Sequence, residues 1–475
     1  MSTYVVRRGF DVRRSAAAFA LAAGAAVVAG ALGLVLEHAS LPPWLVVAAG
    51  VSLLAVVALA VLRHELAVAL AFALLGVVLV EPAPADLVFF VAGAVALATG
   101  RLHLGRAPGV AISLIGLLLI LNLVSAVEAV DAAHAAVFAT TTLYVAVLGL
   151  WLATWVTNRR RARLAAGGYV LAASASAAAA ILALFFAIPG SDRLVFDDRA
   201  QGLFKDANVF GPFLVPAALI LIEETLTPKL FRRRWLSALL VVLLGLGVLF
   251  SYSRGAWVNM AVGAVVVVTL LALRRRGGRK AMLALVLLAL AAASVAATVS
   301  VSGSGDFLTQ RAQLQSYDSD RFGAQAAGLA PGQRYPFGVG PGQFEYVAPI
   351  SAHSTYVRVF AEQGLPGLLT FLALALFTLA AATVNAVAGR DTYGIGSAAL
   401  LGAWCGLLVN SIVIDTLHWR HFWIVAAFIW AGWARRSRSR QARSGSWASS
   451  GVLASAPGEY VAVAAPVAIT PRRGT

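Results

Sequence analysis

Apolar runs of roughly 18–25 residues recur along this chain, and each is long enough to cross a lipid bilayer as a helix. A transmembrane β-barrel would instead show short segments in which apolar and polar residues alternate. The composition agrees with the helical reading, because 60% of the 475 residues are hydrophobic and only 12% are charged. We therefore expect an all-α, polytopic integral membrane helical bundle.

The apolar runs predict about 12–14 transmembrane helices, since the shortest runs are marginal as spans. One polar segment, residues 303–364, is far longer than the other connections and is expected to be a large extracytoplasmic loop. Residues 435–475 are rich in Ser, Ala, Gly and Pro and are expected to form a disordered tail. The predicted spans are 15–36, 43–62, 65–81, 86–99, 109–127, 134–156, 166–189, 208–226, 234–252, 255–273, 281–301, 366–388, 395–414 and 419–434.

Arginine and lysine gather at alternate ends of the predicted spans and not in one patch. Under the positive-inside rule these clusters face the cytoplasm, which places both termini inside and requires an even number of spans. The formal charge of +16 is thereby explained without nucleic acid as a partner. No cleavable signal peptide is evident, and the first span is the expected insertion signal. The clusters are Arg7–Arg14, Arg101–Arg106, Arg159–Arg163, Arg232–Arg234, Arg274–Lys280 and Arg435–Arg443.

The single cysteine, Cys405, lies inside an apolar run. One cysteine excludes an intramolecular disulfide and a cysteine-ligated metal site.

Positive charges also lie on the expected outer side of the membrane, where the positive-inside rule does not explain them. An ionisable group at membrane depth is costly and is by default a functional-site hypothesis. Guanidinium groups that converge near the membrane surface suit a phosphate or diphosphate, because arginine forms bidentate pairs with phosphate oxygens. The alternative is that short outer loops tolerate some arginine. The residues concerned are Arg193, Arg199, Lys205, Arg254, Arg311, Arg321, Arg334, Arg358 and Arg420.

A first polar motif, Lys-Asp-Ala-Asn at residues 205–208, precedes the span 208–226. Helix capping by Asp206 or Asn208 explains this motif about as well as a binding role does. Lys205 adds a cation that a cap does not need, so it is kept as a binding candidate together with Asn208.

A second motif, Ser-Tyr-Ser-Arg-Gly-Ala-Trp at residues 251–257, forms a tight turn between two spans. Capping by Ser253 and interfacial anchoring by Trp257 account for its neighbours. They leave Arg254 unexplained, and we expect this arginine to be functional.

The third motif lies in the 303–364 insert. A Gly-x-Gly-x-Gly run at 338–342 is not a dinucleotide fingerprint, because no strand–helix unit surrounds it, but it lets the backbone approach another group closely. We expect residues 354–363 to form a short helix with His353 at its N-terminus, where backbone N–H groups favour an anion. A lone histidine is more often structural, yet its place in a polar insert favours function. The other candidates in this insert are Arg321, Arg358 and Glu362.

A fourth motif, Asp-Thr-Leu-His-Trp-Arg-His at residues 415–421, connects the last two spans. A solvent-exposed turn at the membrane interface, with an Asp415–Arg420 ion pair, explains this motif about as well as a role in the site does. Asp415, His418 and Arg420 are therefore candidates with this alternative left open.

These motifs together resemble the O-antigen ligase/O-antigen polymerase superfamily of bacterial membrane glycosyltransferases. The resemblance spans roughly residues 200–430 and rests on five motifs in order, which are Lys205–Phe210, Phe250–Ala256, Arg321 ahead of Pro336–Gly342, His353–Tyr356 and Glu362–Gly367. Together with hydropathy and charge, it divides the chain into a cytoplasmic N-terminus (1–14), N-terminal transmembrane helices (15–199), an O-antigen ligase-like catalytic membrane domain (200–434) and a cytoplasmic tail (435–475).

The resemblance implies a bacterial inner-membrane enzyme with its active site on the extracytoplasmic face. It implies metal-independent transfer or polymerisation of a glycan, without a cofactor, from an undecaprenyl-diphosphate-linked donor to a lipid, saccharide or protein acceptor. Arg254, Arg321 and His353 match the functional arginines and histidine of the family. The arginines would stabilise diphosphate charge, and His353 would act as base with Glu362 as orienter or alternative base. Lys205, Asn208, Arg358 and Arg420 are the further diphosphate-binding candidates.

A flippase for a lipid-linked oligosaccharide is the main alternative, because many spans and basic groups suit it equally. A flippase should place its charges along a central path and needs no long outer insert. A scaffold protein explains neither Arg254 nor the insert.

Overall fold

The computed structural model describes residues 42–186, 190–231, 233–274, 316–348 and 350–451. The predicted spans 15–36 and 281–301, the first part of the insert and the end of the tail lie outside these residues. The chain divides into two compact units, Met1–Ala434 and Arg435–Thr475. The bundle described below belongs to the first unit.

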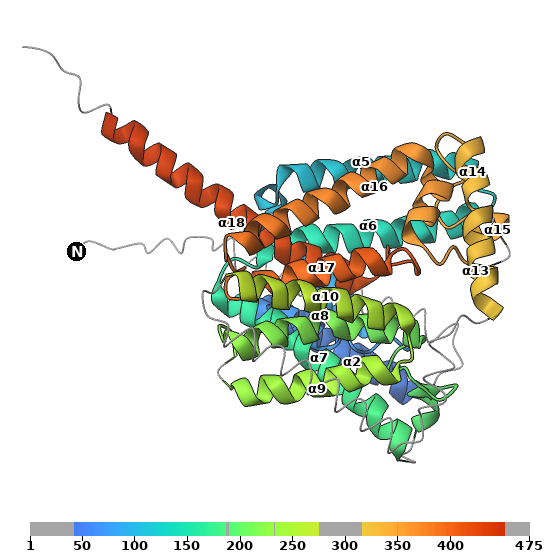
Figure 1. Ribbon diagram of the computed structural model, residues 1–475, viewed down its shortest axis with the longest axis horizontal. Coiled ribbons are helices and arrows are strands. Elements are labelled where there is room, and N and C mark those ends of the chain that lie inside the picture. The colour runs from blue at the N-terminus through green and yellow to red at the C-terminus, as the bar shows by residue number, and fades with distance from the viewer. Residues whose placement is uncertain (1–41, 187–189, 232, 275–315, 349, 452–475) are drawn as a thin grey trace, which may run out of the picture. The chain divides into compact units, whose positions relative to one another are not determined.

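The described part of the first unit is a bundle of α-helices (Figure 1). Short elements connect them: the 3₁₀ turns η1 (Leu104–Arg106), η2 (Ala126–Glu128) and η3 (Ser191–Arg193), and a two-stranded hairpin of β1 (Val195–Phe196) and β2 (Arg199–Ala200). The hairpin pairs Val195 with Ala200 and Phe196 with Arg199. The main helices are α2 (Pro43–Leu62), α3 (His64–Ala73), α4 (Pro84–Ala98), α5 (Gly109–Ser125), α6 (Ala132–Trp155), α7 (Arg159–Phe185), α8 (Ala207–Leu226), α9 (Arg234–Phe250), α10 (Arg254–Leu273), α16 (Thr355–Val387), α17 (Ser397–Asn410) and α18 (Arg420–Gly451).

The prediction of an all-α polytopic membrane protein is confirmed. Among the described residues, 6 helices are long and apolar enough to cross a membrane, and shorter apolar helices accompany them. The predicted span 65–81 differs, because α3 ends at Ala73 after 10 residues. A helix of that length rises only about 15 Å. Turns take over between Ala73 and the next helix, which begins at Pro84.

The end of the last span also differs from the prediction. Helix α18 continues to Gly451, into the tail that was expected to be disordered. The segment from 435 to 444 contains no proline or glycine, and five of its ten residues are arginine, which is a good helix former.

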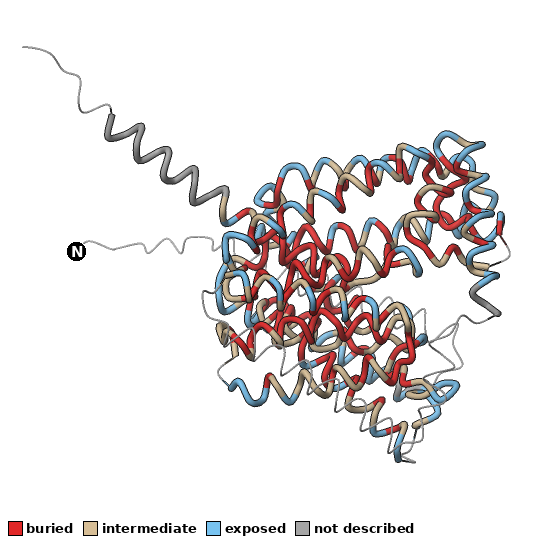
Figure 2. Tube along the Cα trace, viewed as in Figure 1, coloured by how far each residue is buried: buried red, intermediate tan, exposed pale blue. Residues whose placement is uncertain are grey.

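The core of the bundle is built on α8, which is buried along nearly all of its length (Figure 2). Helices α10 and α17 pack closely because small residues meet at their seam. A Cβ on Gly402 would lie 2.6 Å from the carbonyl oxygen of Gly263, so neither glycine has room for a side chain. On the outer faces many large apolar side chains stay exposed, as expected for helices in contact with lipid.

Candidate active site at the insert end of the bundle

Several helix ends meet the polar insert at one end of the bundle, which we call the insert end. It comprises the starts of α8, α10 and α16 and the last turn of α17. The backbone N–H of Thr355, at the start of α16, donates to the carbonyl of Ser411 over 3.0 Å. Gly255, at the start of α10, abuts the side chain of Asn410, because a Cβ there would lie 2.6 Å from its Oδ1. The end of α17 therefore lies between the segments that carry Arg254 and His353.

The described part of the insert contains three short helices, α13 (Ser316–Ala327), α14 (Leu329–Arg334) and α15 (Phe344–Val347). A glycine-rich turn at 338–342 lies between α14 and α15. Two contacts tie the insert to the bundle near the start of α6. Gln343 exchanges hydrogen bonds with the backbone of Asp131, and the hydroxyl of Tyr346 donates to the Asp131 carboxylate over 2.8 Å.

The predicted short helix and the following span are both present, and they join in α16 across a break. Gly364 has φ 66° and ψ −168°, which are not helical angles, and Pro366 follows it. The break frees the carbonyls of Ala361 and Glu362. Val339 and Gly340 donate their N–H groups to these carbonyls over 3.0 and 3.1 Å.

The glycines at 338 and 364 are required by this contact. A Cβ on Gly338 would lie 2.2 Å from the carbonyl carbon of Glu362, and one on Gly364 would lie 2.0 Å from the carbonyl oxygen of Pro336. Both residues also have positive φ. The glycine-rich turn thus satisfies the backbone groups of the broken helix, which must find partners inside the protein.

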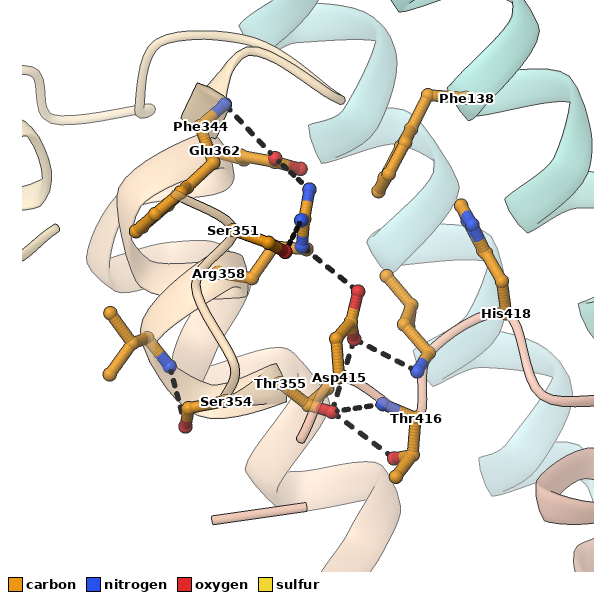
Figure 3. A network of polar contacts seen from close by, with 12 residues as sticks. Phe138, Phe344, Ser351, Ser354, Thr355, Arg358, Glu362, Asp415, Thr416 and His418 are labelled. Carbon is orange, nitrogen blue, oxygen red and sulfur yellow. Dashed lines mark hydrogen bonds and ion pairs between the residues drawn. The ribbon is translucent and has the colours of Figure 1, made fainter. Parts of the chain in front are cut away.

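Arg358 is at the centre of a polar network at the insert end (Figure 3). Its Nε lies 2.9 Å from Oδ2 of Asp415, and one terminal nitrogen lies 2.8 Å from Oε1 of Glu362. The other terminal nitrogen donates to Ser351 over 2.9 Å and pairs with Glu345. The guanidinium group therefore contacts three carboxylates at once.

Aromatic rings enclose the same guanidinium group. It lies 5.3 Å from the ring centroid of Phe138, which comes from α6, and 5.7 Å from that of Phe344. Arg358 is 4% exposed. In so shielded a place the charge is held by its partners and not by water.

The three carboxylates differ in exposure. The side chain of Glu362 is 1% exposed, that of Asp415 20% and that of Glu345 43%. Burial raises the pKa of Glu345, but the hydrogen bond and the charge of Arg358 outweigh burial and lower the pKa below its ordinary value. Glu345 is therefore ionised at neutral pH and reaches the surface of the network.

His353 precedes α16 and is partly buried, with a left-handed backbone at φ 44°. Its carbonyl accepts a hydrogen bond of 2.9 Å from the Gln325 side chain of α13, and the next residue, Ser354, caps α16. Burial, followed by the charge of Arg321, lowers the pKa of His353 below 6.5, against the opposing effect of Asp206 and Asp415. The imidazole is therefore neutral at pH 7 and able to accept a proton.

The connection between α17 and α18 supplies the remaining polar groups. Asp415 accepts from the hydroxyl of Thr355 over 3.2 Å and from the N–H of Leu417 over 3.0 Å (Figure 3). Nε2 of His418 lies 2.8 Å from the hydroxyl of Thr142. Burial lowers the pKa of His418 to about 4. This second histidine is neutral as well, but it is enclosed.

The other three predicted diphosphate-binding residues also have protein partners. Arg420 forms a bidentate ion pair with Asp86, and not the pair with Asp415 that an interfacial turn would have contained. Lys205 lies 3.1 Å from a carboxylate oxygen of Glu81, and Asn208 accepts from Arg199 over 2.9 Å.

Arg254 is the first residue of α10 and is partly buried, and Ser253 caps this helix as predicted. Arg321 lies on α13 and is partly buried too. The structure thus brings His353 within electrostatic reach of Arg321, Arg358 and Asp415.

Sequence reasoning missed Glu345 and Asp86. Glu345 was missed because only basic residues and one carboxylate, Glu362, were selected as candidate site residues in the insert. Asp86 was detectable, because it is an ionisable residue at the start of a predicted apolar span. Its carboxylate also accepts from the Tyr144 hydroxyl over 2.9 Å, which joins α4, α6 and α18.

Within the described ranges, no group of three or more His, Cys, Asp and Glu side chains is placed to hold a metal ion.

Apolar helices with a buried polar network at the insert end define a multi-pass membrane protein with a polar site. The family model described as O-antigen ligase matches residues 239–372, which confirms the resemblance predicted from the motifs. The match contains Arg254, Arg321 and His353 as well as Arg358 and Glu362. No curated protein matches the chain.

Proposed function

We propose that this protein is a membrane glycosyltransferase that takes its glycan from an undecaprenyl-diphosphate-linked donor. The acceptor is a lipid, a saccharide or a protein hydroxyl at the outer face of the inner membrane. The observation that carries this proposal is the O-antigen ligase match over the segment that holds Arg254, Arg321 and His353. The lowered pKa of His353 supports it, since a base for an acceptor hydroxyl must be unprotonated.

In the proposed reaction the acceptor oxygen attacks the anomeric carbon of the donor sugar. The bond from that carbon to the diphosphate oxygen breaks, and undecaprenyl diphosphate leaves with the electron pair. His353 takes the proton of the acceptor hydroxyl. Arg254 and Arg321 stabilise the negative charge that grows on the leaving group, which is worth about 3–4 kcal/mol for a well-placed donor.

Arg358 suits a positioning role in this scheme. Its guanidinium group is occupied by Glu345, Glu362 and Asp415 and has little capacity left for a diphosphate. By holding these three acids it ties the insert, α16 and the α17–α18 connection together. His353 precedes α16 by two residues and depends on the same framework.

A transfer assay separates the enzyme from the flippase. Purified protein, given a polyprenyl-diphosphate-linked glycan and an acceptor, is expected to transfer the glycan in the presence of a chelator, because arginine charge replaces a metal in the proposed mechanism. Arg254→Ala should abolish transfer, and Arg254→Lys should recover only part of it, since an ammonium group cannot make a bidentate contact.

Three results of this assay would contradict parts of the proposal. Loss of transfer on chelation, restored by a divalent cation, would exclude the arginine mechanism. Movement of the glycolipid across vesicles without transfer to any acceptor would favour the flippase. Full activity of Arg254→Ala would show that Arg254 has only a structural role in the turn at 251–257.

The membrane sidedness of the site is tested by reporter fusions. We expect a fusion at residue 325, in the insert, to report the extracytoplasmic side and a fusion at residue 440 to report the cytoplasm, because basic clusters mark the opposite ends of the spans. A matched fusion at residue 229, in the α8–α9 connection, should agree with the one at 440. The same signal at 325 and 440 would refute this topology.

A further inference from the structure

A cavity of about 530 Å³ lies at the end of the bundle opposite the insert end, between the start of α7 and the α8–α9 connection. Its wall carries Arg159, Arg163 and Lys229 together with the apolar Leu230 and Phe231. Small-molecule sites have volumes of roughly 300–1,000 Å³, so this cavity can hold a headgroup-sized ligand.

The two arginines of the cavity are held in place by neutral partners. A terminal nitrogen of Arg159 donates to the carbonyl of Lys229, and Nε of Arg163 donates to the carbonyl of Leu230 over 3.1 Å. Carbonyl oxygens orient a guanidinium group without cancelling its charge, and each arginine has further N–H donors for an anion. Both residues lie in the first two turns of α7, where the helix dipole adds positive potential.

Lys229 contributes to the wall in another way. Its ammonium group lies 2.7 Å from Asp391 and 3.3 Å from Glu223, so its charge is compensated. The neighbouring acid, Glu224, accepts the backbone N–H groups of Lys229, Leu230 and Phe231 over 2.9–3.0 Å. The carboxylate of Glu224 therefore holds the backbone of the α8–α9 connection in place.

We propose that this cavity binds the headgroup of an anionic phospholipid, with the lipid phosphate at Arg159 and Arg163. The positive-inside rule accounts for arginines at this end but not for their fixed orientation around a cavity. A lipid fits better than a soluble anion, because Leu230 and Phe231 line the cavity. The first turns of α9, which follow the lining residue Phe231 in the chain, also expose Trp235 and Leu239 as apolar surface. Basic pockets between transmembrane helices bind such headgroups.

The test measures lipid retention by the full chain in detergent, with native mass spectrometry and thermal unfolding as readouts. We expect cardiolipin and phosphatidylglycerol to be retained and to raise the unfolding temperature, and phosphatidylcholine to do neither. The double variant Arg159→Gln/Arg163→Gln should bind the anionic lipids roughly tenfold more weakly or worse, since it loses charge-assisted hydrogen bonds. Arg106→Gln is the control, because Arg106 is exposed at the same end but does not line the cavity.

Equal retention of anionic lipid by the double variant and the wild type would overturn the proposal. Displacement of the lipid by millimolar inorganic phosphate would show a site for soluble anions instead. If the double variant does not fold, the wild type alone decides the matter. Its retention of anionic lipid must weaken as the salt concentration rises, because salt screens the charge of the two arginines. Retention that does not change with salt concentration contradicts the proposal.

Discussion

Replacement of Arg358 by methionine is expected to lower the free energy of unfolding by about 3–5 kcal/mol and to abolish turnover, because it leaves buried carboxylates without their cation. Glu362 is fully buried, and Asp415 and Glu345 would face it without the guanidinium group between them. Methionine retains much of the side-chain length, so the loss reports the charge and the hydrogen bonds more than the packing.

Chemical unfolding and turnover of the purified variant in detergent give the measurement. Arg334→Met is the matched control, since Arg334 lies exposed on α14 in the same insert and should change neither quantity. Arg358→Lys should recover little, because one ammonium group cannot reach three carboxylates in a planar arrangement. Addition of Glu345→Gln to Arg358→Met should recover part of the stability. Wild-type stability in Arg358→Met would show that the acids do not need this cation.

Replacement of His353 by alanine is expected to lower turnover by about 10²–10⁴-fold, the usual range for the loss of a general base. Donor affinity should change little, because the diphosphate is assigned to Arg254 and Arg321. Turnover and donor affinity are measured on the same purified protein. His103→Ala serves as the control histidine, since His103 is exposed in the connection between α4 and α5.

The pH profile adds a readout that a structural role would not change. Burial and the charge of Arg321 lower the pKa of His353 below 6.5, so the neutral imidazole persists to lower pH than a free histidine would allow. Wild-type activity should therefore fall on the acid side only as the pH drops through this lowered pKa. Arg321→Gln removes one cause of the shift and should move the acid limb to higher pH.

Two outcomes would reassign His353. If donor binding is lost together with turnover, His353 is a ligand of the diphosphate. If neither quantity changes, the residue serves only the start of α16, and Glu362 becomes the better candidate for the base.

Hydropathy alone determines where most of the described helices lie. The predicted span 43–62 coincides with α2, and the span 208–226 differs from α8 by one residue. The length of an apolar run is a local property, and a bilayer requires that length whatever the neighbouring helices are. Local chemistry also identified Ser253 as a cap, since a capping side chain bonds the backbone only three residues away.

The break in α16 and the contact that accompanies it could be predicted only in part from the sequence. The Gly-x-Gly-x-Gly run was interpreted as a place of close backbone approach, and that is what the structure shows. The group approached is the backbone of Glu362 and Gln363, more than twenty residues further along the chain. Proximity of that kind depends on how the insert folds back on α16.

The roles of the charged residues were decided by the tertiary structure. The sequence by itself determined that Arg358, Glu362, Asp415 and Arg420 are ionisable groups at helix ends of a membrane protein, where burial makes a partner necessary. It did not determine the partners, because Arg358 meets Asp415 from another helix connection and Arg420 meets Asp86 from the first part of the chain. Ion pairs act over a few ångströms of space, and which charges come that close is set by the packing of helices distant in sequence.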